Sequence, residues 1–381
     1  MPPIPSIYDT HCAGAGLLAS TPVWGAFKRF RHRYFSDDAN AFPEPPACDL
    51  TGQNVIVSGA NSGIGFEAAA LFAARGASVV LACRAPPPHE PHPDAAIDSI
   101  LARHRHVKRE NLEWWTLDCG DRQSILAFGR RWRESGRTCD ILCNNAGSAF
   151  GALIHTKDGV ELTRQVNFLS HCLLTFLILP SMRNAKAPRV VNTCSIFHFG
   201  GRLDFSNMDY ERAPKTARGL GGTLSYCDSK LWLLMWTREL QKRLSRSQHY
   251  RHVIAHGVHP GFVSTNIWNQ PHIKELPWVL QWLLVKVIGL FSISPQQGSL
   301  CLTYAALHPA YGFTPAQLAE YPARGESAKI GGLFFNRTKP GVTRPEVDDP
   351  VATARLFERA LQDVGGKEVA EDVPGAAPGL E

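Results

Sequence analysis

Asn54-Val55-Ile56-Val57-Ser58-Gly59-Ala60-Asn61-Ser62-Gly63-Ile64-Gly65 is the stretch that decides the fold of this 381-residue chain. A short apolar run leads into three glycines, and an alanine-rich segment follows from Ile64 to Arg75. This order predicts a buried strand, a tight turn and a helix. Glycines in such a turn let the backbone approach a phosphate, and the helix N-terminus supplies N–H donors and a positive dipole. The stretch predicts a pyrophosphate-binding turn, although a plain tight turn has the same glycines.

Alternating strands and helices continue beyond the turn. The expected elements are strand Ser78–Ala82, helix Ala95–His106, strand Leu112–Leu117, helix Ser124–Glu134, strand Ile141–Cys143, helix Val166–Leu179, strand Arg189–Thr193, a helix from Tyr226 to about Leu244, and strand His252–His256. Strands that alternate with helices indicate a parallel sheet covered on both faces. We therefore predict an α/β fold, a Rossmann-type doubly wound parallel sheet in a single domain.

The two ends of the chain differ in composition from its middle. Residues 1–48 are rich in proline, and the tail after Val364 is rich in Gly, Ala, Pro and acidic residues. Such a tail is typical of a flexible, disordered segment. We predict an N-terminal extension at 1–48, a dinucleotide-binding and catalytic domain at 49–345, and a C-terminal helix with a disordered tail at 346–381.

Tyr226 and Lys230 are the strongest candidates for chemistry. They stand four apart in Ser225-Tyr226-Cys227-Asp228-Ser229-Lys230, and residues four apart share one face of a helix. A phenol titrates near ~10 unperturbed, and a fixed cation nearby favours the phenolate. The spacing therefore predicts a tyrosine whose pKa is lowered by Lys230 into the range for proton transfer near neutral pH.

Other polar residues follow the predicted strands. Arg84 ends the second strand, where an acid binds the ribose hydroxyls of NAD and an arginine accommodates the 2′-phosphate of NADP. Arg84 therefore favours NADP, although a solvated strand-end arginine is the alternative. Asn144-Asn145-Ala146-Gly147 follows the fourth strand, and Ser195 ends the fifth. Carboxyl ends of strands face the ligand crevice of such sheets, so the Ser195 hydroxyl is expected to hydrogen-bond a substrate carbonyl.

These motifs together resemble a short-chain dehydrogenase/reductase, and most nearly its retinol dehydrogenase-like branch. The resemblance runs from about Leu50 to Lys339. Its motifs are the glycine turn, Asn144 to Gly147, Val166-Asn167, Ser195, Tyr226-x-x-x-Lys230 and His259-Pro260-Gly261-Phe262-Val263-Ser264-Thr265. The stretch between Ser195 and Tyr226 is long, with Arg202 to Gly222 inserted, which suggests a loop over the substrate pocket.

The resemblance implies a role for each matching residue. Tyr226 would be the acid/base, and Ser195 would polarise the carbonyl. Lys230 would hold the ribose and lower the tyrosine pKa, and Asn167 would complete a water-linked proton relay. The residues implied to border the cofactor are Ser58, Gly59, Asn61, Ser62, Gly63, Ile64, Gly65, Arg84, Asp118, Asn145, Ala146, Gly147, Tyr226, Lys230, Pro260, Gly261, Val263 and Thr265.

The amino-acid composition indicates the cellular compartment and the classes of binding partner. The ten cysteines are scattered without a Cys-x-x-Cys pair, so reduced thiols in a cytoplasmic protein are expected, and no metal site. The formal net charge of +6 comes from basic clusters that offer no interleaved aromatic stacking platform, which argues against nucleic acid. Whether the chain forms a homodimer is left open.

Two apolar segments indicate the class of substrate and a possible association with a membrane. Leu276–Phe291 is apolar nearly all round but shorter than the ~20 residues of a spanning helix. By the resemblance it caps the pocket and implies a lipophilic substrate, while a core or interface helix is the alternative. Val23–Phe35 has an aromatic face beside basic residues. It is expected to dock on its own domain, with peripheral association to an intracellular membrane left open.

The predicted function is oxidoreduction with NADPH, interconverting a lipophilic ketone or aldehyde and its alcohol. Two alternatives are kept. Reduction of a carbon–carbon double bond uses the same tyrosine and lysine, and a non-catalytic dinucleotide-binding scaffold shares the fold. An altered Tyr226 or Lys230 would favour the scaffold, and both residues are present. Substrate identity and physiological direction stay open.

Overall fold

The computed structural model describes residues 42–85, 92–149, 152–212, 221–263, 292–313, 317–318, 322–323 and 325–365. Several predicted features lie outside these ranges: Thr265, the Val23–Phe35 helix, the Leu276–Phe291 segment and the tail beyond residue 365. What was predicted for them stays a prediction.

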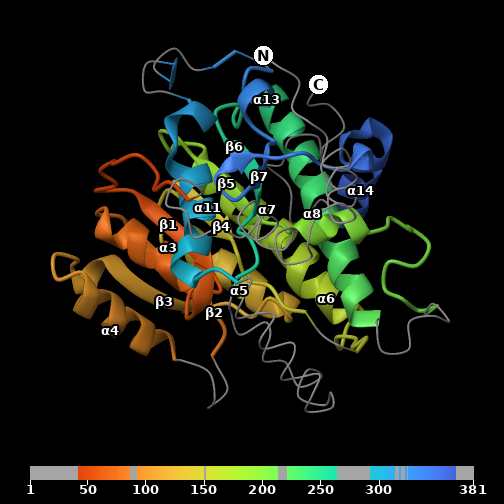
Figure 1. The fold of residues 1–381 in the computed structure, drawn as a ribbon, viewed down its shortest axis with the longest axis horizontal. Helices are drawn as coiled ribbons and strands as arrows, with labels where there is room; N and C mark the ends of the chain where they lie inside the picture. Colours follow the sequence, from red (N-terminus) through yellow and green to blue (C-terminus); the bar gives the residue numbers. More distant parts are fainter. Residues whose placement is uncertain are drawn as a thin grey trace, which may run out of the picture.

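Among the described residues, eight strands form one sheet in the order β3-β2-β1-β4-β5-β6-β7-β8 (Figure 1). They are β1 (Asn54–Ser58), β2 (Ser78–Cys83), β3 (Leu112–Thr116), β4 (Ile141–Asn144), β5 (Arg189–Thr193), β6 (Ile254–His259), β7 (Phe334–Asn336) and β8 (Lys339–Pro340). Neighbours from β3 to β7 pair in parallel, and β8 pairs with β7 antiparallel. The predicted doubly wound parallel sheet is confirmed.

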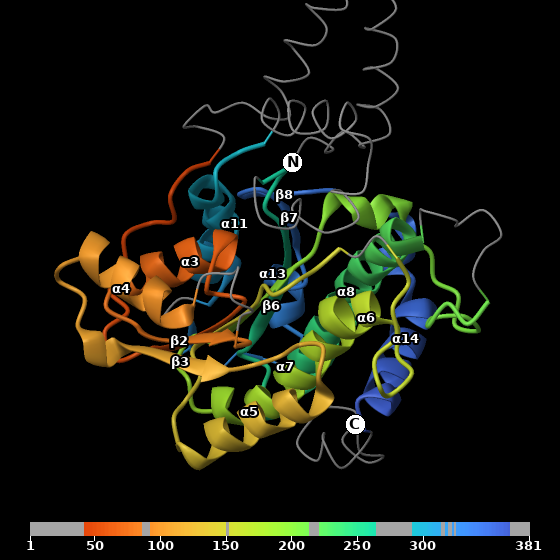
Figure 2. The same ribbon diagram turned by 90° about the horizontal axis from the view of Figure 1, so that it is seen from below.

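Helices cover both faces of this sheet (Figure 2). They are α3 (Gly63–Ala74), α4 (Pro93–Arg103), α5 (Arg122–Glu134), α6 (Leu162–Arg164), α7 (Ser170–Met182), α8 (Gly221–Arg246), α11 (Pro295–Leu307), α13 (Ser327–Ile330) and α14 (Pro350–Asp363). One apolar core lies between the sheet and α3, α4 and α11. A second lies between the opposite face and α5, α7, α8 and α14. Strands buried on both faces explain why their sequences are apolar runs rather than alternating patterns.

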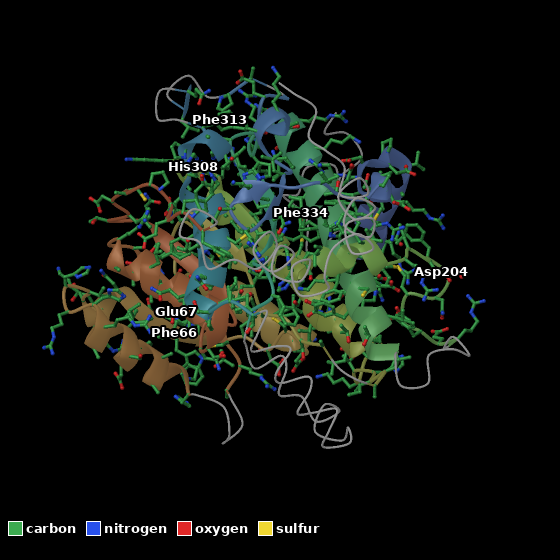
Figure 3. The ribbon with its side chains drawn as sticks, in the orientation of Figure 1. Phe66, Glu67, Asp204, His308, Phe313 and Phe334 are labelled. Atoms are coloured by element: carbon green, nitrogen blue, oxygen red, sulfur yellow. The ribbon has the colours of Figure 1, made fainter. Side chains whose placement is uncertain are left out.

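Side chains at the helix ends fix where the helices begin and how they pack. Asp121 caps α5 by accepting the Gln123 N–H, and Ser294 and Gln297 form a capping box at the start of α11. Phe66 and Glu67 are neighbours on α3 (Figure 3). Arg103 of α4 is ion-paired with Glu67 at 2.6 Å and lies 5.1 Å from the centroid of the Phe66 ring. These contacts hold α4 to the helix that opens with the glycine turn.

The helix that runs from Leu162 to Met182 meets the length and hydropathy required to cross a membrane, alone among the described residues. However, 78% of its apolar window is buried inside the protein. Its residues belong to the core on the α5 and α8 face of the sheet. This helix therefore packs in the core of the protein, and its burial explains why its sequence is apolar.

The predicted elements differ from the structure at several places. The helix expected from Val166 begins as α6 and a π-helical segment, η3 (Gln165–Leu169), before continuing as α7. β6 begins at Ile254 rather than His252 and extends to His259. β7 and β8 were not predicted, because strands of three and two residues have no recognisable period. A π-helical segment of this kind often marks a functional site.

Candidate active site

The glycine turn between β1 and α3 has the backbone that a phosphate site needs. Gly59 has φ +67°, in the region that favours glycine, and its N–H donates to the Ala82 carbonyl of β2 at 2.8 Å. A Cβ on Gly65 would lie 2.5 Å from Asn145 Nδ2 and closer still to the Gly59 carbonyl. A side chain at Gly65 would therefore force the turn open.

The N-terminus of α3 fits a bound pyrophosphate. Its N-cap residue, Ser62, is extended and makes no side-chain capping hydrogen bond, and the first turn contains no acidic residue. The first N–H groups of a helix need a partner, and an anion also interacts favourably with the helix dipole. Ile64, in this first turn, packs against the buried cluster of Phe42, Val263 and Ile293. The residues present are therefore suited to the phosphates of a nicotinamide dinucleotide.

Ser58 and Asn145 tie this turn to the loop after β4. The buried Ser58 hydroxyl oxygen accepts the N–H groups of Asn145 at 2.9 Å and Ala146 at 3.0 Å. Asn145 Nδ2 donates to the Ser58 carbonyl at 3.0 Å. Both side chains thus join the end of β1 to the end of β4.

Asn167 lies in the π-helical segment and anchors the next part of the same loop. Its Oδ1 accepts the Ser148 N–H at 2.9 Å, and its Nδ2 donates to the Ser148 carbonyl at 2.8 Å and to Ser229 Oγ at 3.2 Å. A Cβ on Gly147 would lie 3.3 Å from Asn167 Oδ1 and 3.5 Å from Lys230 Nζ. Asn167, Gly147 and Lys230 therefore lie close together.

Ser195, Tyr226 and Lys230 lie together where β5 ends against α8. The Ser195 side chain lies beside the Tyr226 phenol, and the Ser195 hydroxyl oxygen accepts the Phe197 N–H at 3.2 Å. Lys230 Nζ donates to the Thr193 carbonyl at 2.8 Å and lies 5.6 Å from the centroid of the Tyr226 ring. The arrangement can place a phenol and a hydroxyl on one carbonyl oxygen.

The pKa of Tyr226 shifts in the direction opposite to the one predicted. Burial raises the pKa of Tyr226 to about 12, and the hydrogen bond to Ser195 opposes only part of this rise. Burial also lowers the pKa of Lys230 to about 8. The expectation that Lys230 lowers the phenol pKa is therefore wrong for the protein alone, because desolvation is the larger effect. This shift favours the protonated phenol at neutral pH.

The remaining predicted cofactor residues lie along the carboxyl edge of the sheet. Arg84 directly follows β2 and is exposed, two residues beyond the Ala82 carbonyl that binds the glycine turn. Asp118 follows β3, and its Oδ1 accepts the Gly120 N–H at 2.8 Å. After β6 come Pro260, then Gly261 with φ +102°, and the buried Val263. All follow the carboxyl ends of strands in this sheet, where the ligand crevice of such a fold is formed.

Three residues that contribute to this site were not predicted from the sequence. Thr193 acts through its backbone carbonyl, which no sequence pattern reveals. Ser148 does likewise through both of its backbone groups. Ser229 had a usable signal, because it stands between Tyr226 and Lys230 at helical spacing and donates to the Tyr226 carbonyl at 2.8 Å.

The described part of the insertion after Ser195 packs against α8, and its predicted place over the pocket stays a prediction. Asp228 Oδ1 accepts the Arg202 N–H at 2.6 Å, and the Tyr210 hydroxyl donates to Asp228 Oδ2. Asp228 is two residues beyond Tyr226, about 200° around the helix. Residues 202–212 therefore bind the face of α8 that points away from the phenol. The rest of the loop, 213–220, lies outside the described residues.

Comparison with known proteins agrees with this geometry. Residues 53–207 match the family model described as short chain dehydrogenase. The chain is 30% identical to Retinol dehydrogenase 13 from Homo sapiens over 331 residues, covering 84% of this chain and 87% of that protein. This chain belongs to the short-chain dehydrogenase family. It falls in the retinol dehydrogenase-like branch, and it is an oxidoreductase of alcohols and carbonyls that uses a nicotinamide dinucleotide.

Further relatives of the short-chain dehydrogenase place it among similar enzymes. It is 34% identical to Retinol dehydrogenase 12 from Homo sapiens, covering 83% of this chain and 87% of that protein. It is 31% identical to the WW domain-containing oxidoreductase from Homo sapiens, covering 84% of this chain and 70% of that protein. A crystal structure of an uncharacterised protein from Mycobacterium paratuberculosis matches with a TM-score of 0.59 and 24% identity, covering 85% of this chain and 96% of that one. At that identity the match supports the fold alone.

Proposed function

We propose that this short-chain dehydrogenase reduces a lipophilic ketone or aldehyde with NADPH, with Tyr226 as the proton donor. The observation that carries the proposal is the meeting of Ser195, Tyr226 and Lys230 beside a loop held by Asn167. The nicotinamide supplies the hydride when bound. The chain supplies a protonated phenol and a hydroxyl for the carbonyl oxygen, so that charge developing on this oxygen meets two hydrogen-bond donors.

The protonation state of the Tyr226 phenol determines which direction of the reaction is favoured. Because burial raises the pKa of Tyr226 to about 12, the phenol holds its proton throughout the physiological range. Reduction needs a protonated donor, and oxidation needs the phenolate as a base. The site therefore favours reduction at neutral pH, and oxidation is expected to accelerate as the pH rises.

A lipophilic substrate is supported by what flanks Tyr226. Phe197 is 43% exposed, one of three large apolar side chains exposed to this degree in the described ranges. Its ring meets the Tyr226 ring edge-on, with centroids 6.0 Å apart. An exposed aromatic ring beside the proton donor suits an apolar substrate, and relatives named retinol dehydrogenases agree with such a class.

Purified enzyme incubated with a panel of lipophilic aldehydes and ketones is expected to oxidise NADPH and to form the corresponding alcohols. Loss of NADPH absorbance measures the rate, and a conjugated enone in the panel separates two chemistries. Carbonyl reduction yields an allylic alcohol, whereas double-bond reduction yields the saturated ketone. Formation of the saturated ketone alone would replace our proposal with the double-bond reductase, and no turnover with any substrate would favour a scaffold.

Arg84→Asp is expected to shift the preference between NADPH and NADH by roughly 10- to 100-fold toward NADH. The change removes a cation from the strand end next to the glycine turn and adds a carboxylate, which repels a 2′-phosphate and accepts ribose hydroxyl bonds. The ratio of kcat/KM for the two cofactors measures the shift. Arg130→Asp makes the same charge change at an exposed position of α5 and is the control. A wild-type enzyme that already prefers NADH would show that Arg84 has another role.

A further inference from the structure

Two polar bridges join α8 to the segment formed by α6 and η3. Ser225 and Ser229 are four residues apart, so they share one face of α8. Ser225 Oγ donates to Glu161 Oε2, and Ser229 Oγ accepts from Asn167 Nδ2 at 3.2 Å. Each serine directly precedes a catalytic candidate, Tyr226 or Lys230. The face of α8 that binds α6 and η3 thus neighbours the face that carries the chemistry.

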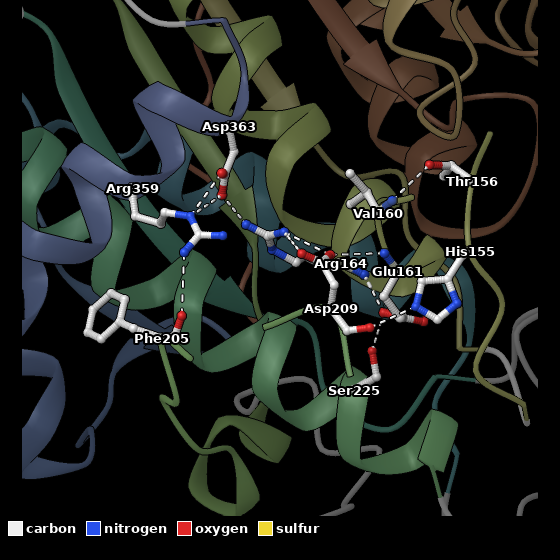
Figure 4. Close-up of polar contacts among 10 residues, drawn as sticks. All are labelled: His155, Thr156, Val160, Glu161, Arg164, Phe205, Asp209, Ser225, Arg359 and Asp363. Atoms are coloured by element: carbon white, nitrogen blue, oxygen red, sulfur yellow. Dashed lines mark hydrogen bonds and ion pairs between the residues drawn. The ribbon is translucent and has the colours of Figure 1, made fainter. Parts of the chain in front are cut away.

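Glu161 connects the beginning of one helix to the beginning of the other. It is fully buried, and its carboxylate accepts the N–H groups of Thr163 at 3.0 Å and Arg164 at 2.8 Å as the N-cap of α6. The same carboxylate accepts the Ser225 hydroxyl (Figure 4). Hydrogen bonds to a buried charged acceptor are short and directional. This carboxylate therefore sets where the first turns of α8 lie against the helix that carries Asn167.

Two other segments hold Glu161 in place from outside (Figure 4). Asp209 of the insertion accepts the Glu161 N–H at 3.0 Å and the Arg164 guanidinium at 2.6 Å. Arg164 is 1% exposed and is also paired with Asp363, the last residue of α14. Arg359 pairs with Asp363 at 2.9 Å. The insertion and the C-terminal helix thus converge on the short helix that Glu161 caps.

We propose that Glu161 is a positioning residue for Tyr226, acting through the hydroxyl of Ser225. This inference rests on the proposed role of Tyr226 as proton donor. A phenol that donates to a substrate oxygen must lie at hydrogen-bonding distance from it, and a displacement of about 1 Å can cost on the order of 100-fold in rate. Ser225 is the residue next to Tyr226, and its bond to Glu161 holds that turn of α8.

A purely structural role predicts something different. If Glu161 only caps α6, breaking the bond to Ser225 lowers the fraction of folded enzyme and leaves each folded molecule as fast as before. If Glu161 positions Tyr226, folded molecules themselves become slow. Single-turnover kinetics separate the two, because the amplitude reports the amount of active enzyme and the rate constant reports the chemical step.

Ser225→Ala is the decisive variant, because it removes the bridge and leaves both capping hydrogen bonds of Glu161 in place. With cofactor and carbonyl substrate saturating, the single-turnover rate constant for hydride transfer is expected to fall about 10- to 100-fold. The matched control is Ser181→Ala. Ser181 is a partly buried serine on α7 whose oxygen accepts from Trp132 Nε1 at 2.8 Å, so its loss tests the general cost of a missing hydroxyl. The control is expected to keep the wild-type rate constant.

Glu161→Gln and the double variant that combines it with Ser225→Ala complete the test. Because both residues act through one hydrogen bond, the double variant is expected to lose no more than the worse single variant. An unchanged rate constant in Ser225→Ala, with or without a smaller amplitude, would overturn the positioning role. Absence of carbonyl reduction by the wild-type enzyme would instead reject the proposed function, so the two failures are distinguishable.

Discussion

Tyr226→Phe is expected to lower kcat for carbonyl reduction by about 10²- to 10⁴-fold, while the affinity for NADPH stays nearly unchanged. The substitution removes the hydroxyl that donates the proton and changes little volume. The interaction between the phenol hydroxyl and the Ser195 side chain is lost with it. However, Lys230 keeps its bond to the Thr193 carbonyl, so the part of the site attributed to the cofactor remains.

Lys230→Ala is the informative companion to this variant. Lys230 is buried, and its ammonium approaches the Gly147 backbone as well as the Tyr226 ring. Its removal is expected to weaken cofactor binding and to lower kcat, whereas Tyr226→Phe should lower kcat alone. Steady-state kinetics and fluorescence titration with NADPH separate the two patterns. Near-normal turnover by purified Tyr226→Phe would reject the mechanism.

Arg164→Met is expected to reduce the free energy of unfolding by about 3–5 kcal/mol. The guanidinium is 1% exposed and is shared by two carboxylates, Asp209 at 2.6 Å and Asp363. Its removal leaves both carboxylates, each 19% exposed, without their shared cation. The insertion and the C-terminal helix also lose their common attachment point. Asp363 keeps its pair with Arg359, but the cost is large because the charge of Asp209 is left uncompensated where water has little access.

Urea unfolding measured by circular dichroism tests this, provided that the transition is two-state. Arg359→Met is the matched control, because Arg359 pairs with the same Asp363 but its side chain is 35% exposed. A partly exposed pair of this kind contributes about 0–1 kcal/mol. Equal losses in the two variants would show that burial does not distinguish the two arginines, contrary to our interpretation of the network.

Short-range patterns in the sequence were sufficient to predict the fold and the family, without any tertiary contact. Strand Asn54–Ser58, its three glycines and the alanine-rich helix are read from neighbouring residues, as is the Tyr226-x-x-x-Lys230 spacing. Such signals are short-range, because strand, turn and helix preferences act over a few residues. The parallel sheet followed from the alternation of elements. Family membership followed from the same motifs.

Other features depended on contacts between residues far apart in the chain. Glu161 and Ser225 are 64 residues apart, and nothing in either neighbourhood indicates that they bond. Arg164 and Asp363 are 199 residues apart. The contacts of the insertion likewise depend on how α8 and α14 pack in the tertiary structure. The pKa of Tyr226 belongs to this group too. The sequence placed Lys230 beside the phenol, but the burial that raises the pKa to about 12 is contributed by the whole fold.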